Sequence, residues 1–182
     1  MKKKIYIIRH CKAEGQFPDA ALTEVGQKQA EKLADFLSDI KVERLLSSPF
    51  LRAQQTIAPY AEQTGMKVEL DSRLAERHLD PEAVSDWLEW MKNSFTDLSL
   101  RDAGGESGEE ATQRIAGVID DIIASDAENT MIVTHGGMIT LLLHQFNVQV
   151  GFEQWKALSN PDVYVLNVLD GNVTYERLWK EV

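Results

Sequence analysis

The chain has 182 residues, of which 29 are acidic and 19 basic, and its net charge is −10. A field of that sign repels nucleic acid and anionic membrane surfaces, so neither is an expected partner, and an anionic substrate needs a local group of cations. The apolar run after the first lysines, Ile5–Ile8, is shorter than the roughly 7–15 residues of a signal peptide or the ~20 of a membrane span, so a cytoplasmic location is expected.

In the first half of the chain, short apolar runs alternate with amphipathic segments. Ile5–Ile8 is rich in β-branched residues and predicts a buried strand, and Arg44–Ser47 and Lys67–Leu70 predict two more. Thr23 is suited to cap a helix between the first two strands. The apolar face of that helix is predicted to comprise Ala30, Leu33, Ala34 and Leu37.

Capping residues mark the next two helices. Ser48-Pro49 predicts a helix that runs to about Gln63, where Gly65 would end it. Asp80-Pro81 predicts another helix by the same pattern, followed by a loop over residues 94–106. The predicted apolar face of this later helix is Val84, Trp87, Leu88 and Met91.

The second half of the chain continues the alternation and then ends in a hairpin. Ser107 and Glu110 have the spacing of a capping box ahead of an apolar helical face. A strand is predicted at Met131–Thr134 and a mostly buried helix at Met138–Phe146. The hairpin is predicted from Val163–Leu169, the turn Asp170-Gly171-Asn172, and Val173–Trp179.

This order of elements predicts the fold class. Strands alternating with helices are typical of a three-layer α/β/α sandwich, and the final hairpin makes its mostly parallel central sheet mixed. The helix after Asp80 would form a small helical cap insertion in this fold. No repeat or linker divides the chain, so residues 1–182 are predicted to form a single domain.

Three predicted strands are followed by residues suited to anion binding. In an α/β sheet, ligands collect just outside the carboxyl ends of the strands. Arg9 and His10 follow the first strand, His135 and Gly136 follow the strand at 131–134, and Arg52 lies one turn into the helix after 44–47. Two arginines and two histidines at one edge suit a phosphoryl group, because arginine presents a rigid fork to phosphate oxygens.

Taken singly, these residues have structural explanations. A histidine at a strand end is more often a packing residue, Arg52 on a helix is ordinarily a surface charge, and residues 134–137 can form a simple glycine turn. Their joint placement at one sheet edge favours a phosphate site, to which backbone N–H groups near Gly136 would add positive dipole.

The ordered set of motifs resembles the histidine phosphatase superfamily, in the branch that includes cofactor-dependent phosphoglycerate mutase and its phosphatase relatives. The resemblance covers nearly the whole chain, and the set is specific although each motif alone is weak. The segments are Arg9-His10 with Glu14, Leu22-Thr23-x-x-Gly26-x-x-Gln29-Ala30, Ser47-Ser48-Pro49-x-x-Arg52-Ala53-x-x-Thr56, Arg73-Leu74-x-Glu76, Gly105-Glu106-Ser107 and Thr134-His135-Gly136-Gly137.

The resemblance implies a phosphatase mechanism that needs neither a metal nor a cofactor. His10 would attack phosphorus as the nucleophile, while Arg9, Arg52 and His135 would bind the phosphoryl oxygens and stabilise their charge. Gln16, which stands where the family usually has Asn, and Gly136 are the further substrate-binding positions.

Glu76 is the general acid that the resemblance implies, because it follows Arg73-Leu74 as in the family pattern. It would protonate the leaving oxygen and then activate water. Glu106 competes for this role from a glycine-rich loop, where its expected function is structural. His78 is expected at the pocket rim or on the surface, and His144 on the surface or in packing.

Two departures from the family pattern bear on function. Cys11, the only cysteine, replaces the usual Gly after the nucleophile, and its side chain would crowd the pocket or make it sensitive to oxidation. The Gly-x-Trp-Glu-Gly-like segment of the mutases is missing after the acid. The shorter, more open cap favours attack by water, and therefore hydrolysis of a small phosphorylated metabolite.

Three alternatives remain open at this point: a phosphoglycerate mutase-type phosphotransferase, a protein phosphohistidine phosphatase, and a non-enzymatic phospholigand-binding module. Residues 77–106 argue against a protein substrate because they would cover the pocket. Specificity is expected to depend on rim residues, among them Phe17, His78, Trp87 and Trp90. The sequence predicts neither the substrate nor the oligomeric state.

Overall fold

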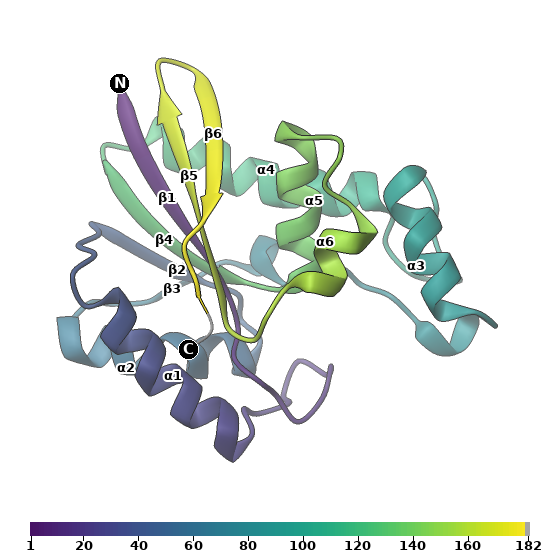
Figure 1. The fold of residues 1–182 in the computed structure, drawn as a ribbon, viewed down its shortest axis with the longest axis horizontal. Helices are drawn as coiled ribbons and strands as arrows, with labels where there is room; N and C mark the ends of the chain where they lie inside the picture. The colour runs from purple at the N-terminus through teal and green to yellow at the C-terminus, as the bar shows by residue number, and fades with distance from the viewer. Residues whose placement is uncertain (181–182) are drawn as a thin grey trace.

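A mixed sheet of six strands forms the centre of the computed structural model, which describes residues 1–180 (Figure 1). The strands are β1 (Lys2–Arg9), β2 (Arg44–Ser47), β3 (Glu69–Leu70), β4 (Asn129–Thr134), β5 (Asp162–Leu169) and β6 (Asn172–Arg177). Their order across the sheet is β3-β2-β4-β1-β5-β6. β1 to β4 run parallel, whereas β5 pairs antiparallel with both β1 and β6.

Helices cover both faces of this sheet. They are α1 (Glu24–Leu37), α2 (Leu51–Thr64), α3 (Trp87–Thr96), α4 (Gly108–Ala124), α5 (Gly136–Phe146) and α6 (Phe152–Ala157), with short 3₁₀ turns η1 (Ser72–Leu74) and η2 (Pro81–Ala83). Figure 1 shows α1 and α2 on one side of the sheet, and α4, α5 and α6 on the other. The predicted three-layer α/β/α sandwich with a mixed, mostly parallel sheet is therefore confirmed.

Each face of the sheet has its own apolar core. Ile7 of β1 packs with Ile115 of α4 and Ile139 of α5, while the next residue, Ile8, packs with Leu33 of α1 and Ile57 of α2. Successive side chains of a strand point to opposite faces, so one β-branched run supplies both cores. Burial on both faces fixes the register of β1, and hence the place of the residues that follow it.

Several predicted boundaries are confirmed at their capping residues. The Thr23 side chain accepts a hydrogen bond from the Gly26 N–H at the start of α1, and the predicted capping box of Ser107 and Glu110 begins α4. Gly65 ends α2 at φ 68°, in the left-handed region that glycine adopts without steric cost. The predicted face of α1 is buried.

The predicted start of α2 was wrong. The helix begins at Leu51 with Phe50 as its N-cap, because Ser48 and Pro49 continue the turn out of β2. The Ser48 hydroxyl instead lies 2.8 Å from the His135 ring. β3 is also shorter than predicted, since only Glu69 and Leu70 pair with β2.

The segment between β3 and α4 also differs from its prediction. Asp80 caps η2 and not a full helix, and Asp86 caps α3, which continues to Thr96 and so includes part of the predicted loop. Leu88, predicted to be on the apolar face, is 59% exposed, whereas Met91 and Phe95 are buried. We call residues 77–106 the cap, because α3 projects from the body of the sandwich (Figure 1).

The remaining features lie in the second half of the chain. α6 was not predicted, since its six residues are too few to show a helical period. The final hairpin was predicted, and its turn places Asp170 at φ 48° and Gly171 at φ 85°.

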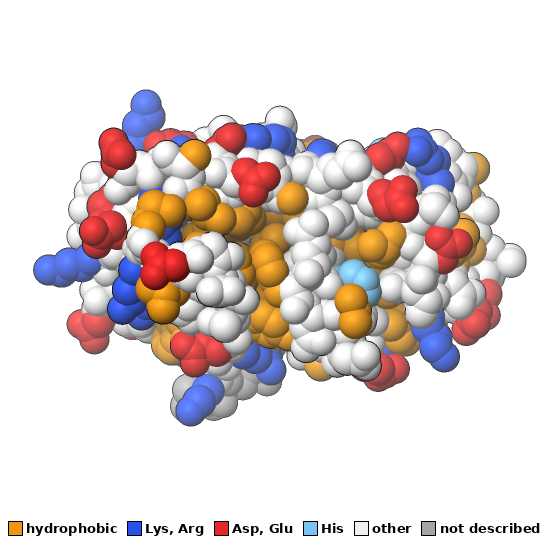
Figure 2. All heavy atoms as spheres, turned by 90° about the horizontal axis from the view of Figure 1, so that it is seen from above, with side chains coloured by type: hydrophobic (Ala, Val, Ile, Leu, Met, Phe, Trp, Pro, Cys, Tyr) orange, Lys and Arg blue, Asp and Glu red, His pale blue; other side chains and the backbone are white. Residues whose placement is uncertain are grey.

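Seen from the end at which β1 begins, charged side chains surround a furrow of apolar ones (Figure 2). Within residues 1–180, every helix is too short or too polar to cross a membrane.

Candidate active site

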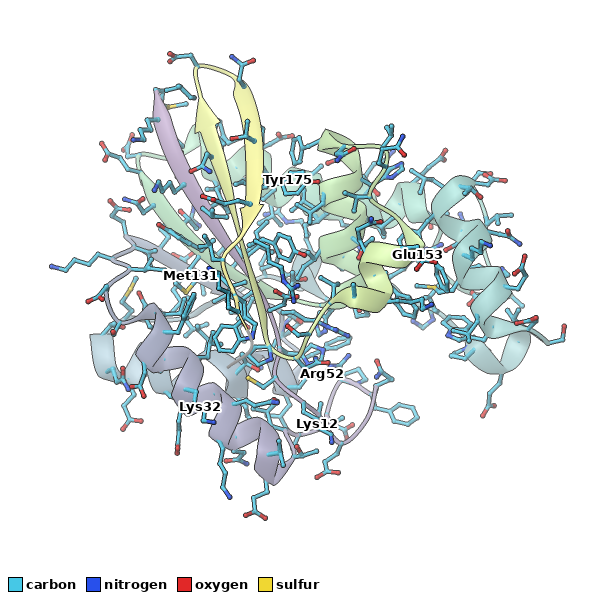
Figure 3. All side chains as sticks on the ribbon, viewed as in Figure 1. Lys12, Lys32, Arg52, Met131, Glu153 and Tyr175 are labelled. Atoms are coloured by element: carbon cyan, nitrogen blue, oxygen red, sulfur yellow. The ribbon has the colours of Figure 1, made fainter. Side chains whose placement is uncertain are left out.

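Strand register brings the predicted site residues to one edge of the sheet. Arg9 of β1 lies opposite Thr134 of β4, so His10 and His135 leave neighbouring strands side by side. Their ring centroids are 5.1 Å apart. Arg52 joins them from the first turn of α2, at the lower end of the strands in Figure 3.

His10 is held in one orientation by hydrogen bonds at both ring nitrogens. Nδ1 lies 2.7 Å from the Cys11 carbonyl oxygen, which can only accept, so Nδ1 carries the proton. Nε2 is then the unprotonated nitrogen, and it accepts a hydrogen bond from Arg52 Nε at 3.3 Å. An unprotonated ring nitrogen is the form that a nucleophilic histidine requires.

The surroundings of His10 keep its ring neutral. The side chain is 7% exposed. Burial lowers the pKa of His10 to about 3, and the positive charges of Arg52 and Arg9 act in the same direction against the hydrogen bond to Cys11. The lone pair on Nε2 therefore persists at neutral pH.

This environment predicts that His10 will not titrate near neutrality. In ¹⁵N-histidine NMR spectra recorded from about pH 8 to about pH 5, where an ordinary histidine gains a proton, the His10 ring signals should stay at their neutral-tautomer positions. Spectra of His10→Asn identify the signals. A midpoint close to the unperturbed value would contradict the prediction.

Arg52 connects the nucleophile to the loop after β1. Its side chain is 1% exposed, and burial lowers its pKa, against the field of Glu76. Nη1 donates to the backbone carbonyls of Gln16 and Phe17 at 3.2 and 3.0 Å. The guanidinium also lies over the Phe50 ring, at 5.1 Å from its centroid.

Arg9 is held from the other side of the site by the segment before β5. Its Nη1 donates to the carbonyl of Leu158 at 3.1 Å, and Asn160 Nδ2 donates to the His10 carbonyl at 2.9 Å. Asp162, paired with Arg177 at 2.9 Å, receives the Ser159 N–H and so fixes this segment. Arg9 Nε is buried and has no hydrogen-bond partner among residues 1–180.

His135 is fully buried between its neighbours. Its Nε2 lies 2.8 Å from the Ser48 hydroxyl, which accepts a hydrogen bond from the Phe50 N–H and so can donate its own proton to Nε2. In that tautomer Nδ1 carries the ring proton, and within the described residues it has no partner. Burial holds the pKa of His135 well below its usual range. Arg9 Nε and His135 Nδ1 are thus two unused donors beside His10.

Glu76 points into the same site from the segment after η1. Its carboxylate accepts the Gly137 N–H at 3.1 Å and the Arg77 N–H at 2.8 Å. A Cβ at Gly137 would lie 2.6 Å from Glu76 Oε1, so this close approach requires glycine. Glu76 also raises the pKa of both Arg9 and Arg52 against the effect of their burial, as a carboxylate close to both does.

Glu106 has a structural position. It forms a two-pronged ion pair with Arg114, at 2.6 and 2.8 Å, and it accepts the His78 N–H at 3.1 Å. Burial raises the pKa of Glu106, but the Arg114 and His78 hydrogen bonds outweigh it and hold that pKa below the usual value. Arg114 also donates to the Arg73 and Ala75 carbonyls at 2.8 and 3.2 Å, next to Glu76.

The structure also places the other residues that the sequence singled out. The Cys11 side chain is buried in the α1–α2 core, so it does not crowd the site, and burial raises its pKa to about 12, which disfavours oxidation. Gln16 contacts Arg52 through its backbone carbonyl and not its side chain, which is exposed. His78 is an exposed residue of the cap, and His144 Nδ1 binds the Val150 carbonyl.

Sequence reasoning missed the residues that hold the catalytic candidates in place. Phe50 packs its ring edge-on to His135, with centroids 5.0 Å apart, and Thr134 Oγ1 donates to the Leu74 carbonyl at 2.7 Å. Asn160 donates a hydrogen bond to the His10 carbonyl, and Arg114 donates to the carbonyls of Arg73 and Ala75. Nothing in the spacing of a sequence indicates which carbonyl a side chain meets.

No group of three or more metal-binding side chains is found in the part of the chain that the structure describes. The cations at the site are the two guanidinium groups of Arg9 and Arg52. Their fixed forks and the N-terminus of α5, which begins at Gly136, face the edge where β1 and β4 end. This arrangement suits a tetrahedral dianion next to the unprotonated Nε2 of His10.

Comparison with known proteins agrees with this chemistry. A model of the histidine phosphatase superfamily (branch 1) matches residues 5–180. The chain is 30% identical over 155 residues to a provisionally named phosphoserine phosphatase 2 of Hydrogenobacter thermophilus, covering 75% of each chain. It is 27% identical over 185 residues to glucosyl-3-phosphoglycerate phosphatase of Mycobacterium tuberculosis, covering 86% of this chain and 80% of that one. A solved structure of mycobacterial glucosyl-3-phosphoglycerate phosphatase shares the fold, with a TM-score of 0.78 at 24% identity over 97% of both chains.

Proposed function

The chain belongs to the histidine phosphatase superfamily (branch 1), and from this premise we propose that it hydrolyses phosphomonoesters of small metabolites through a phosphohistidine on His10. The observation that carries the proposal is the state of that ring. Nδ1 is tied to the Cys11 carbonyl, and Nε2 is left unprotonated beside Arg52.

In the first step, His10 Nε2 attacks phosphorus and the bond from phosphorus to the ester oxygen breaks. Arg9, Arg52 and His135 bind the three equatorial oxygens, with Arg9 Nε and His135 Nδ1 as unused donors. The ester oxygen departs on the side opposite Nε2 and takes a proton from Glu76, which enters this step in its protonated form. The products of this step are the free alcohol and a phosphohistidine.

In the second step, a water molecule attacks the same phosphorus and the bond to Nε2 breaks. Glu76, now ionised, accepts the proton of this water. The Nδ1–H bond to the Cys11 carbonyl keeps the departing ring neutral and in its original tautomer. Inorganic phosphate then leaves, and the enzyme returns to its starting state.

The surroundings of the site favour a small substrate. The cap lies next to Glu76 through the Arg77 N–H and Glu106, so a small phosphorylated metabolite fits better than a folded protein. Relatives named for phosphoserine and glucosyl-3-phosphoglycerate support this class. The net charge of −10 argues against nucleic acid and membrane partners, and we expect the enzyme in the cytoplasm.

The first test is hydrolysis without a metal. Purified enzyme dialysed against excess EDTA should release phosphate from p-nitrophenyl phosphate and from glycerol 3-phosphate at the rates of untreated enzyme, because guanidinium groups supply the charge. Loss of activity that only a divalent ion restores would contradict the mechanism. Phosphate binding without turnover would indicate a phospholigand-binding module.

A further inference from the structure

Phe17 is an exposed aromatic residue at the edge of the site. Its side chain is 78% exposed, more than any other large hydrophobic side chain of the described residues. Its own carbonyl accepts a hydrogen bond from Arg52 Nη1 at 3.0 Å. An apolar ring in water, on a residue whose backbone binds a candidate phosphate-binding guanidinium, is unlike the scattered apolar residues of an ordinary surface.

The backbone around Phe17 is fixed. Three successive carbonyls, of Gln16, Phe17 and Pro18, accept hydrogen bonds from the start of α2, the last from the Leu51 N–H at 2.9 Å. Ala20 N–H also donates to the Phe17 carbonyl at 3.0 Å. A ring presented on an ordered backbone can cover a ligand at a low entropic cost.

The other arginines of the chain are committed elsewhere. Besides Arg9 and Arg52, every arginine has an acceptor in the described residues. The pairs are Arg44 with Glu69, Arg73 with Asp71 and Asp121, Arg101 with Glu110, Arg114 with Glu106, Arg177 with Asp162, and Arg77 with the carbonyls of Leu100 and Glu106 and the hydroxyl of Ser94. No arginine is left over to receive a second anionic group of the substrate.

The cap carries more acidic than basic side chains. Its basic side chains are Arg77, Lys92 and Arg101, and counting His78 as a cation brings them to four. Its carboxylates number seven: Asp80, Glu82, Asp86, Glu89, Asp97, Asp102 and Glu106, of which the first five are exposed. The alcohol part of a substrate that extends from the phosphate towards the cap enters a region of negative potential. This potential disfavours substrates whose alcohol part carries a carboxylate or a second phosphate.

We propose that the preferred substrates are monophosphates of uncharged alcohols with an apolar face, and that Phe17 is the specificity residue which covers that face. The inference rests on the proposed function, because it concerns the alcohol bound at the same site. It ranks bisphosphates and phosphorylated carboxylic acids below these substrates, which would separate this chain from the relatives named for phosphoserine and glucosyl-3-phosphoglycerate.

Two comparisons of kcat/KM test this proposal. The first compares 4-carbamoylphenyl phosphate with 4-carboxyphenyl phosphate, which have nearly the same shape. The wild-type enzyme should prefer the uncharged carbamoyl compound by about tenfold, the scale of one unfavourable charge contact. The second compares wild type with Phe17→Ala on 1-naphthyl phosphate and on glycerol 3-phosphate.

Phe17→Ala should lower kcat/KM about tenfold for 1-naphthyl phosphate, mainly by raising KM, because the variant buries less apolar area of this substrate. For glycerol 3-phosphate, which has little apolar area, kcat/KM should fall less than about twofold. Val148→Ala, which removes a similarly exposed apolar side chain, is the matched control and should change neither. Preference for the carboxylate, or an equal loss on both substrates in Phe17→Ala, would overturn this inference and leave the phosphatase function standing. Absence of hydrolysis of all four compounds would overturn both.

Discussion

His10→Ala is expected to abolish phosphatase activity, with kcat reduced at least ~10⁴-fold, on the scale seen when an enzyme loses its covalent nucleophile. No neighbour can replace it. His135 is fully buried with its Nε2 on Ser48, and the raised pKa of Cys11 keeps that thiol protonated inside the core. Phosphate release from p-nitrophenyl phosphate measures the effect.

The fold should survive this substitution. Among residues 1–180, the His10 side chain makes hydrogen bonds only to the Cys11 carbonyl and to Arg52, and neither is a contact between apolar side chains. Thermal unfolding of His10→Ala should therefore stay cooperative and close to that of wild type. His144→Ala serves as the matched control, because its ring binds the Val150 carbonyl away from the site, and it should keep wild-type turnover.

The covalent intermediate gives an independent readout. Wild-type enzyme quenched during turnover of a ³²P-labelled ester should carry base-stable, acid-labile label on His10, as expected for a phosphoramidate. Label on Cys11, or undiminished hydrolysis by His10→Ala, would show that the mechanism is wrong.

The positions of Arg9, His10 and His135 could be predicted from the sequence because strand ends are strongly marked. The β-branched run of β1 is buried on both faces, so its register leaves little freedom in where the chain emerges. Parallel neighbours end at the same edge, which places His10 beside His135 without knowledge of any side-chain contact. The apolar faces of α1 and α4 were predictable for a similar reason, because each helix is long enough to show a clear helical repeat of apolar residues.

Orientation beyond a strand end was not predictable. Cys11 was expected to point into the site, but alternation applies only within β1, and the backbone after Arg9 turns the thiol into the α1–α2 core. Ser48 was taken for a helix cap because the pattern of serine followed by proline does not reveal the competing partner, His135. The start of the helix in residues 77–106 was predicted wrongly. That helix is short, and Asp80 and Asp86, six residues apart, are equally suitable N-cap residues.

Glu76→Gln is expected to separate substrates by the quality of their leaving group. An alkoxide leaving from glycerol 3-phosphate needs its proton in the transition state, whereas nitrophenolate is stable enough to leave without one. General acid catalysis contributes ~10²–10⁴-fold, and we expect a loss in that range for glycerol 3-phosphate. The loss for p-nitrophenyl phosphate should be far smaller. Both carboxylate oxygens of Glu76 accept backbone N–H groups, so the amide of glutamine also turns one favourable contact into a clash between donors.

Glu106→Gln is the matched control, because it changes a neighbouring carboxylate in the same way. Its effect should be on stability, since the variant weakens an ion pair with Arg114 that holds the backbone of residues 73 and 75. Any shift of the Glu76 segment would act on both substrates together, so the ratio of the two rates should remain that of wild type. If Glu106→Gln lowers glycerol 3-phosphate hydrolysis selectively, and Glu76→Gln lowers both substrates equally, the general acid is Glu106. The ratio isolates proton transfer because Arg9, Arg52 and His10 treat the phosphoryl group of both esters alike.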